Sequence, residues 1–256
     1  MTPADPAPVL DLIEAFRRSK TMFSAVALGV FDRLQESPAD ARTLASELNA
    51  SADAVERLLD ACVGLGLLKK ESGTYRNLPV AGSYLCRSSP QTLAGYIVYS
   101  NDVLYRLWAN LDDAVREGSH RWRQTFGLEG PIFSSLFKTE EAMRDFLVGM
   151  HGFGLLSSPP VVAAFDLSRF RRLVDLGGAT GHLAMAATQR YPELSAILFD
   201  LPAVIEVARE YVSRSPAASR ITLTAGDFFA GQLPEADLFA LGRILHDWDE
   251  VKIRRL

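Results

Sequence analysis

The chain has 256 residues, of which 48% are hydrophobic and 23% charged, a balance typical of globular proteins and enough for two ordinary domains. The net charge of −4 and the pI of about 5.6 argue against a general affinity for nucleic acid or for acidic membranes. Its two cysteines exclude a disulfide framework and a four-cysteine zinc site. No apolar run approaches the roughly 20 residues of a membrane span, and the start lacks a signal segment, so a cytoplasmic protein is expected.

Residues 9–115 carry the pattern of a winged-helix domain followed by a bridging helix. Apolar spacing predicts a helix over 9–30, a short amphipathic helix over 41–48, and a longer helix that Ser51 can cap. Residues 67–76 then alternate around a Ser-Gly pair, as the two strands of a hairpin do. Helix, turn, helix and hairpin in this order predict a winged helix.

Winged helices often bind DNA, and the second helix then enters the major groove with basic or amide side chains. The charged residues of that helix are Asp53, Glu56, Arg57 and Asp60, three acids against one base. The phosphate backbone repels such a helix. The sequence therefore favours a dimerisation or substrate-covering module, and no nucleic-acid partner is expected.

The middle of the chain is predicted to be helical. Apolar residues at helical spacing over 93–115 indicate a core-facing stripe, and residues 116–160 are expected to form a helical linker. Its last helix begins after Thr139 and is expected to end at residues 159–160, because two prolines cannot donate the hydrogen bonds that continue a helix. His151 lies near the apolar stripe of this helix and is interpreted as a core or surface histidine rather than a ligand.

Residues 161–256 alternate strand and helix signals, the pattern of an open, doubly wound, Rossmann-like α/β sheet. The strands are expected at 173–176, 196–199, 221–225 and 237–241. Ligands of such sheets bind beyond the carboxyl ends of the strands. Four polar residues close or follow strands at that edge, namely Asp175, Asp200, Asp227 and His246. We therefore expect the functional site there.

A glycine-rich turn, 177–181, joins the first of these strands to its helix. The dinucleotide fingerprint G-x-G-x-x-G fails because Ala179 and His182 stand where it needs glycine, and no Gly-Lys-Ser/Thr follows as a phosphate-binding loop requires. The remaining pattern is D-x-G-G-x-x-G, with Asp200 ending the next strand. It predicts a ribose-bearing cofactor, because a carboxylate can accept hydrogen bonds from both ribose hydroxyls. A turn that needs glycine only for packing is the alternative.

The loops after the third and fourth strands hold further candidates. Gly226 permits close approach, Asp227 can accept a hydrogen bond from an exocyclic amine, and Phe228 offers an aromatic face for a purine. A turn followed by core aromatics is the alternative for this segment. Arg243 could pair with a cofactor carboxylate, stack over its base, or be a plain surface arginine. His246, with an unperturbed pKa of about 6.5, is the candidate general base, and a capping or packing histidine is its alternative.

These residues carry a family resemblance that covers nearly the whole chain. The matching segments, in an order and spacing specific to the family, are 28–32, 112–118, 164–168, 174–181, 199–202, 226–229 and 243–248. With them the chain resembles the S-adenosylmethionine-dependent O-methyltransferases of the acetylserotonin O-methyltransferase type, most of all the acetylserotonin O-methyltransferase-like branch. Plant caffeate and flavonoid O-methyltransferases are related to this family.

The resemblance implies a mainly α winged-helix dimerisation domain with its bridging helix (9–115), a helical linker (116–160) and a Rossmann-like catalytic domain (161–256). It also implies S-adenosyl-L-methionine as cofactor, no metal, and a homodimer. Carried over by position, the cofactor-binding residues are Gly177, Asp200, Leu201, Gly226, Asp227, Phe228, Arg243 and Phe137. His246 is the implied catalytic residue, which takes the proton from a hydroxyl of a small aromatic substrate as that oxygen attacks the sulfonium methyl group.

The sequence departs from the family pattern at four places. Ala179 replaces the usual third glycine of the turn, Phe137 replaces a cofactor-contacting tyrosine, and Gly154 replaces a tryptophan. Family members also continue past the position of Leu256, so we expect the C-terminal part of the catalytic domain to be missing. These departures keep a second hypothesis open, a catalytically weak or inactive methyltransferase-like module that serves in binding or dimerisation.

Overall fold

The computed structural model describes residues 4–127 and 140–256. The chain divides into two compact units, Met1–Ile132 and Phe133–Leu256, each of which is described by itself. The described part of the first unit contains α1 (Ala7–Ala27), α2 (Val30–Glu36), β1 (Ala39–Asp40), α3 (Ala41–Glu47), α4 (Ala52–Gly64), β2 (Leu68–Glu71), β3 (Thr74–Asn77), α5 (Pro79–Tyr84), α6 (Ala94–Tyr99), the π-helical η1 (Ser100–Leu104), α7 (Tyr105–Trp108), α8 (Leu111–Glu117) and α9 (Trp122–Phe126).

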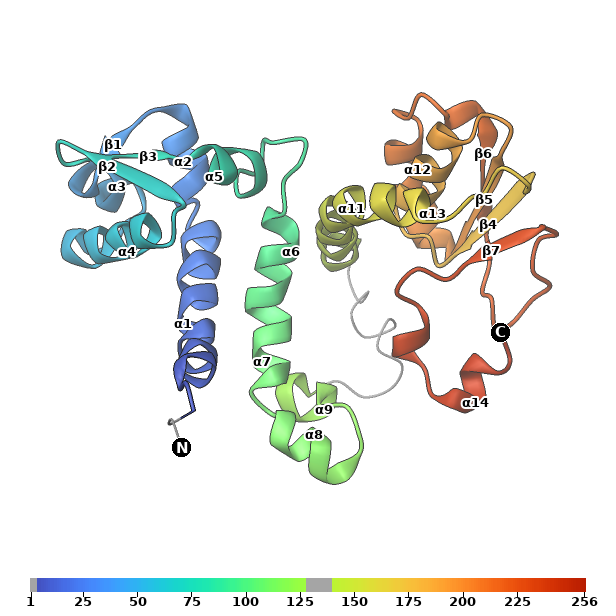
Figure 1. Ribbon diagram of the computed structural model, residues 1–256, viewed down its shortest axis with the longest axis horizontal. Coiled ribbons are helices and arrows are strands. Elements are labelled where there is room, and N and C mark those ends of the chain that lie inside the picture. Colours follow the sequence, from blue (N-terminus) through green and yellow to red (C-terminus); the bar gives the residue numbers. More distant parts are fainter. Residues whose placement is uncertain (1–3, 128–139) are drawn as a thin grey trace. The chain divides into compact units, whose positions relative to one another are not determined.

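The first unit is mainly helical and contains the expected winged helix. Its three strands pair antiparallel in the order β1-β3-β2, beside α2, α3 and α4 (Figure 1). The Asp40 side chain accepts a hydrogen bond from a backbone N–H of α3 and so caps that helix. Ser72 and Gly73 have φ values of 50° and 80°, the left-handed pair that lets two strands turn back tightly. Leu59 and Tyr75 are fully buried and tie the second helix to the hairpin.

Two acids of α4 have partners on the hairpin. The Lys70 ammonium lies 2.8 Å from Asp60 Oδ1 and 3.2 Å from Glu56 Oε1. The Tyr75 hydroxyl donates to the same Asp60 oxygen at 2.7 Å. These hydrogen bonds lower the pKa of Asp60, with that from Lys70 the largest cause. Two of the acidic residues that argue against DNA binding thus connect α4 to the β2–β3 hairpin.

The bridging segment differs from the sequence expectation. A single core-facing stripe was expected over 93–115, but α6 runs into η1 and α7, and residues 109–110 separate α7 from α8. Ile97 is buried, whereas Trp108 and Val115 are 67% and 75% exposed. The π-helical turn adds a residue and rotates later side chains away from the stripe. The core-facing interpretation is therefore wrong for the second half of this segment.

The second unit is an α/β domain with an entirely parallel sheet. Its described elements are α11 (Glu140–Ala163), β4 (Arg172–Leu176), α12 (His182–Arg190), β5 (Ser195–Asp200), α13 (Pro202–Val212), the 3₁₀ turn η2 (Ala218–Arg220), β6 (Ile221–Ala225), β7 (Leu238–Ala240), the 3₁₀ turn η3 (Leu245–Asp247) and α14 (Glu250–Ile253). The strand order is β6-β5-β4-β7. All three strand pairings are parallel, as expected of an open, doubly wound sheet, and the α/β prediction is confirmed.

The order of the strands fixes where a ligand can bind. β5 lies on one side of β4 and β7 on the other, so the direction of winding reverses at β4. Buried Ala184 of α12 and Ala208 of α13 pack on one face of the sheet. Phe199 and Val174 belong to the cluster on the other face, with Leu233 packed against it. In such sheets the reversal opens a crevice at the carboxyl ends of the strands.

Helix α11 continues through Pro159 and Pro160 to Ala163, so the expected end at the two prolines is wrong. Two prolines forgo two backbone hydrogen bonds. Packing offsets this loss, because Val162 is buried in the core cluster that includes α12.

Residues 146–163 of α11 are also long and apolar enough to cross a membrane by length and composition, contrary to the expectation that no such run exists. One third of that window is buried inside the structure, and core helices of folded domains pass the same test.

Candidate active site

The sequence-predicted site residues lie at one edge of the parallel sheet. Asp175 is the second-last residue of β4 and Asp200 the last of β5. Asp227 follows β6 by two residues, Arg243 follows β7 by three, and His246 lies in η3. Because the strands are parallel, their carboxyl ends share this edge. Phe137 falls outside the described residues.

Asp200 links the glycine-rich turn to the following helix. Its Oδ2 accepts the Ala179 N–H at 2.9 Å, and its Oδ1 accepts the Leu201 N–H at 2.7 Å. Burial nevertheless raises the pKa of Asp200 to about 6, and these two bonds only partly oppose the rise. A carboxylate offers about four lone-pair sites, so each oxygen retains room for a further donor. The arrangement suits a diol such as a ribose.

The turn itself is held in left-handed conformations. Gly177, Ala179 and Gly181 have φ values of 65°, 50° and 82°. A Cβ on Gly177 would collide with Ile244 and would lie 3.5 Å from Phe228 Cε1. The structure thus brings the turn together with Phe228, as expected, and with Ile244, which the sequence did not suggest. Ile244 adjoins Arg243 in sequence, but no local pattern marks it as a neighbour of the turn.

Asp175 carries a buried carboxyl near the end of β4, next to Gly178 of the turn. It is 2% exposed, and its Oδ2 has no hydrogen-bond partner among the described residues. A Cβ on Gly178 would lie 2.8 Å from this oxygen, which explains the glycine there. Burial raises the pKa of Asp175 to about 7, and the charge of Asp200 adds to the rise. The site therefore carries two carboxyls that hold protons more tightly than ordinary aspartates.

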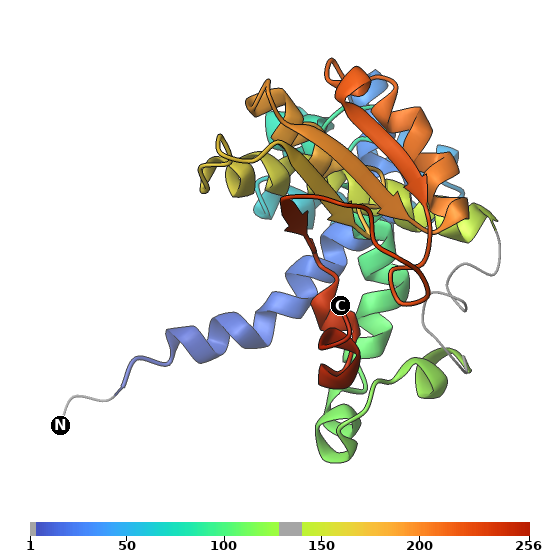
Figure 2. The same ribbon diagram turned by 90° about the vertical axis from the view of Figure 1, so that its right-hand side faces the viewer.

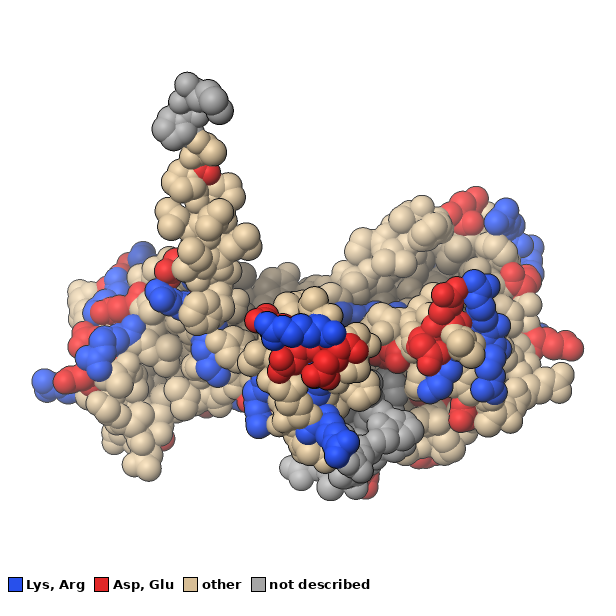
Figure 3. All heavy atoms as spheres, turned by 90° about the horizontal axis from the view of Figure 1, so that it is seen from below, with Lys and Arg blue, Asp and Glu red and all other residues tan. Residues whose placement is uncertain are grey.

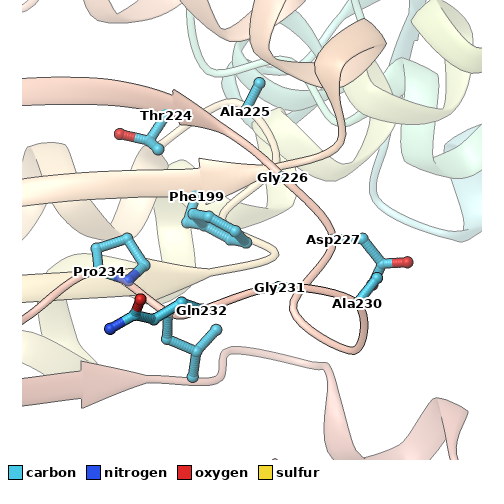
Figure 4. Close-up of a pocket in the computed structure, with 10 residues that line it drawn as sticks. Phe199, Thr224, Ala225, Gly226, Asp227, Ala230, Gly231, Gln232 and Pro234 are labelled. Atoms are coloured by element: carbon cyan, nitrogen blue, oxygen red, sulfur yellow. The ribbon is translucent and has the colours of Figure 1, made fainter.

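The loop after β6 borders a cavity of about 490 Å³ (Figure 4). Two of the predicted site residues, Gly226 and Asp227, line this cavity. The Asp227 side chain is exposed, points away from Phe199 in Figure 4, and accepts the Phe229 N–H at 2.8 Å. A Cβ on Gly226 would collide with the Phe199 ring, so packing is reason enough for this glycine. The cavity does not include Asp200, Arg243 or His246.

The segment after β7 carries the candidate base. The His246 side chain is 65% exposed, and its Nε2 lies 3.3 Å from Asp247 Oδ1. Burial raises the pKa of Asp247, while the charges of His246 and Arg243 oppose the rise. The Arg243 guanidinium lies 4.4 Å from the ring centroid of Phe153. Side chains of neighbouring residues usually diverge, so the contact between His246 and Asp247 could not be foreseen.

Two further histidines lie behind the turn. His151 Nδ1 is 2.8 Å from Thr180 Oγ1, and its ring lies 4.1 Å from the Tyr211 ring, centroid to centroid, at a tilt of 44°. His151 is partly buried and has a hydrogen-bond partner, and its interpretation as a core or surface histidine rather than a ligand stays a prediction. His182 Nδ1 is 2.8 Å from Ser158 Oγ. In the sequence His182 stands out only as a break in the dinucleotide fingerprint, although its place at the start of α12 is a signal that it adjoins the turn.

This sheet order, with a glycine-rich turn and an acid that ends the second strand, defines the Rossmann-like methyltransferase class of fold. The chain belongs to the O-methyltransferase family: residues 108–256 match its O-methyltransferase domain, and residues 10–87 match its dimerisation domain. It is an S-adenosyl-L-methionine-dependent O-methyltransferase.

Relatives agree with this assignment. Acetylserotonin O-methyltransferase of Gallus gallus is 40% identical, over 98% of this chain and 74% of that protein. The probable bifunctional dTTP/UTP pyrophosphatase/methyltransferase protein of Homo sapiens is 39% identical, over 99% of this chain but 41% of its own length. The crystal structure of human N-acetylserotonin methyltransferase in complex with SAM is 36% identical, with a TM-score of 0.88 over 100% of this chain and 76% of that one.

The residues at this edge fit the cofactor. Asp200 offers two oxygens for a ribose, and Phe228 lies beside the turn as an aromatic surface. The turn lacks two glycines of the dinucleotide fingerprint, at Ala179 and His182, and the Gly-Lys-Ser/Thr of a phosphate-binding loop. An adenosyl group without phosphates matches this set better than a dinucleotide does.

Proposed function

We propose that the protein methylates a hydroxyl group of a small aromatic molecule, with His246 as general base. The observation that carries the proposal is the position of His246, which is exposed and lies in η3, the first element after β7. The similarity to acetylserotonin methyltransferases, which covers nearly the whole chain, supports a substrate of the N-acetylserotonin kind.

The cofactor would be held by residues of the turn and of the loops after β5, β6 and β7. When bound, it supplies a methyl group on a sulfonium centre. Asp200, beside Leu201, would accept the ribose hydroxyls, and Gly177 would lie against the cofactor. Further residues proposed to hold it are Gly226, Asp227, Phe228, Arg243 and Phe137.

The role of His246 is to remove a proton from the substrate hydroxyl. Histidine is the side chain that most often serves as a general base in enzymes. Asp247 lies against Nε2, so the proton is taken by the other ring nitrogen, Nδ1. The adjacent carboxylate would stabilise the imidazolium that results.

The expected domain boundaries at 115 and 160, the homodimer and the cytoplasmic location also stay proposals. The match to a dimerisation domain over residues 10–87 supports the homodimer.

The described residues of α1 add an apolar surface suited to a dimer interface. Val9, Leu12 and Phe16 are each more than half exposed, an unusual arrangement for one apolar face.

The test of the proposed chemistry is His246→Ala, with His120→Ala, an exposed histidine of the first unit, as the control. We expect His246→Ala to lower the rate of methyl transfer to N-acetylserotonin or a related phenol by roughly 10²–10⁴-fold, the usual contribution of a general base. Calorimetry should show S-adenosylmethionine binding unchanged in both variants.

Two outcomes contradict the proposal. Equal turnover in His246→Ala and the wild type would remove His246 from the mechanism. A wild type that binds S-adenosylmethionine but transfers no methyl group to any aromatic hydroxyl would support the second hypothesis, a methyltransferase-like binding module.

A further inference from the structure

Three residues of α11 support the glycine-rich turn from behind. His151, Gly154 and Ser158 follow each other at spacings of three and four residues and therefore lie on one face of the helix. His151 Nδ1 is 2.8 Å from Thr180 Oγ1 inside the turn. Ser158 Oγ is 2.8 Å from Nδ1 of His182, the residue directly after the turn. The helix thus contacts the end of the turn at two points.

Gly154 lies between these two hydrogen bonds and fits the His182 ring. A Cβ at position 154 would collide with three atoms of the imidazole. Helices disfavour a glycine in their interior, yet any other residue here would displace the ring. The imidazole of His182 therefore fills space that the helix leaves open.

The turn needs such support at its end. Its start is tied to β5 through Gly177 N–H, which donates to Phe199 O at 2.8 Å, and through the bond from Ala179 to Asp200. Ala179 and Gly181 are both left-handed, and an alanine in that region is strained. At its other end the turn continues into α12, and there the Thr180 and His182 side chains bond to α11.

Both imidazoles are neutral around pH 7. Burial lowers the pKa of each histidine to about 4. The charges that face them act in the same direction, Arg243 on His182, and His182 and Arg214 on His151. The Tyr211 ring covers His151 from α13. The support consists of hydrogen bonds between neutral groups, so it adds no positive charge beside a cationic sulfonium.

We infer that His182 is a positioning residue of the cofactor site. Gly154 and Ser158 fix its ring, and with the His151–Thr180 bond they let α11 hold the turn in its cofactor-binding conformation. A preformed turn binds more tightly because it does not have to be ordered on binding. The inference rests on the assignment of the turn to the cofactor and not on the role of His246.

The first test removes one hydrogen bond without opening a cavity. Ser158→Ala should raise the Kd for S-adenosylmethionine, measured by calorimetry, by about threefold to tenfold, the effect of one lost hydrogen bond. Thr180→Val should act alike, because it removes the partner of His151. Ser213→Ala is the matched control, since Ser213 is an exposed serine whose hydroxyl donates to Glu210 O of the preceding helix. A merely structural role would lower the free energy of unfolding and leave the Kd of the folded protein unchanged.

The second test uses the fit between Gly154 and His182. Gly154→Ala should weaken binding of S-adenosylmethionine, but should have little further effect when His182→Ala has already removed the ring. Gly64→Ala, in α4, is the control, because a Cβ there meets nothing within 4 Å.

Two outcomes would overturn the inference. One is a wild-type Kd in both Ser158→Ala and Thr180→Val, and the other is an effect of Gly154→Ala that is the same with and without the His182 ring. Should Gly154→Ala fail to fold, the first two variants decide. A wild type that does not bind S-adenosylmethionine would contradict the cofactor assignment instead.

Discussion

Ala179 shows how one side chain in the glycine-rich turn affects stability. It has a φ of 50°, where an L-residue costs roughly 1–2 kcal/mol, while glycine would cost about 0.5–1 kcal/mol in chain entropy. We expect Ala179→Gly to raise the free energy of unfolding in urea by about 0.5–1 kcal/mol. Ala186→Gly, inside the right-handed helix α12, is the control and should lower it by about 1 kcal/mol. A decrease in both variants would show that Ala179 is not strained.

Asp200 should make cofactor binding depend on pH. Burial raises its pKa from 3.8 to about 6, so between these values the folded chain keeps a proton that the unfolded chain has lost. The free energy of unfolding therefore falls as pH rises through this window, and Asp175 extends the fall to about pH 7.

Cofactor binding should respond in the opposite direction, because hydroxyl donors of a ribose favour the ionised carboxylate of Asp200. We expect the Kd for S-adenosylmethionine to decrease from pH 5 to pH 7.5, as followed by calorimetry, and to change less in Asp200→Asn. Identical profiles for the two proteins would contradict this role.

At the residue scale, the sequence located polar groups better than it located their neighbours. Asp200 and His246 could be placed at the site because each closes or follows an apolar run, and parallel strands end at one edge. The neighbours of the glycines could not be predicted. Phe199 against Gly226 and Ile244 against Gly177 depend on how distant segments pack.

At the scale of elements, the α/β unit was predictable because its strands are buried apolar runs bounded by turn residues. β4 and β6 begin and end within one residue of the expected ranges. Helical segments were less predictable. Apolar spacing over 93–115 could not show that Trp108 faces outward, because spacing does not tell whether another surface lies opposite. Nor could Pro159 and Pro160 show that packing of α11 outweighs two lost hydrogen bonds.

At the scale of the whole molecule, the first unit exposes an apolar surface on α1. The N-terminal part of α1 extends away from the other elements of the first unit (Figure 2). The face of α1 seen in Figure 3 is largely free of charge near the N-terminal end of the helix. Ala25 and Val26, at the other end, are its buried residues. Leu12 and Phe16 are 74% and 52% exposed. Apolar patches of this kind mark protein interfaces, and the match to a dimerisation domain supports our proposal of a second copy as the partner.

We therefore expect the wild type to behave as a dimer of 28.1 kDa chains in size-exclusion chromatography with light scattering. The double substitution Leu12→Glu and Phe16→Glu should give a monomer, because burying two unpaired carboxylates in an apolar interface costs several kcal/mol of association energy. Val251→Glu is the control, since Val251 is equally exposed, at 73%, but lies in the second unit. The circular dichroism of all three proteins should be alike, because these side chains contribute little to the folded chain itself. A double variant that stays dimeric would show that α1 is not the interface, and a wild type that stays monomeric at high concentration would contradict the homodimer.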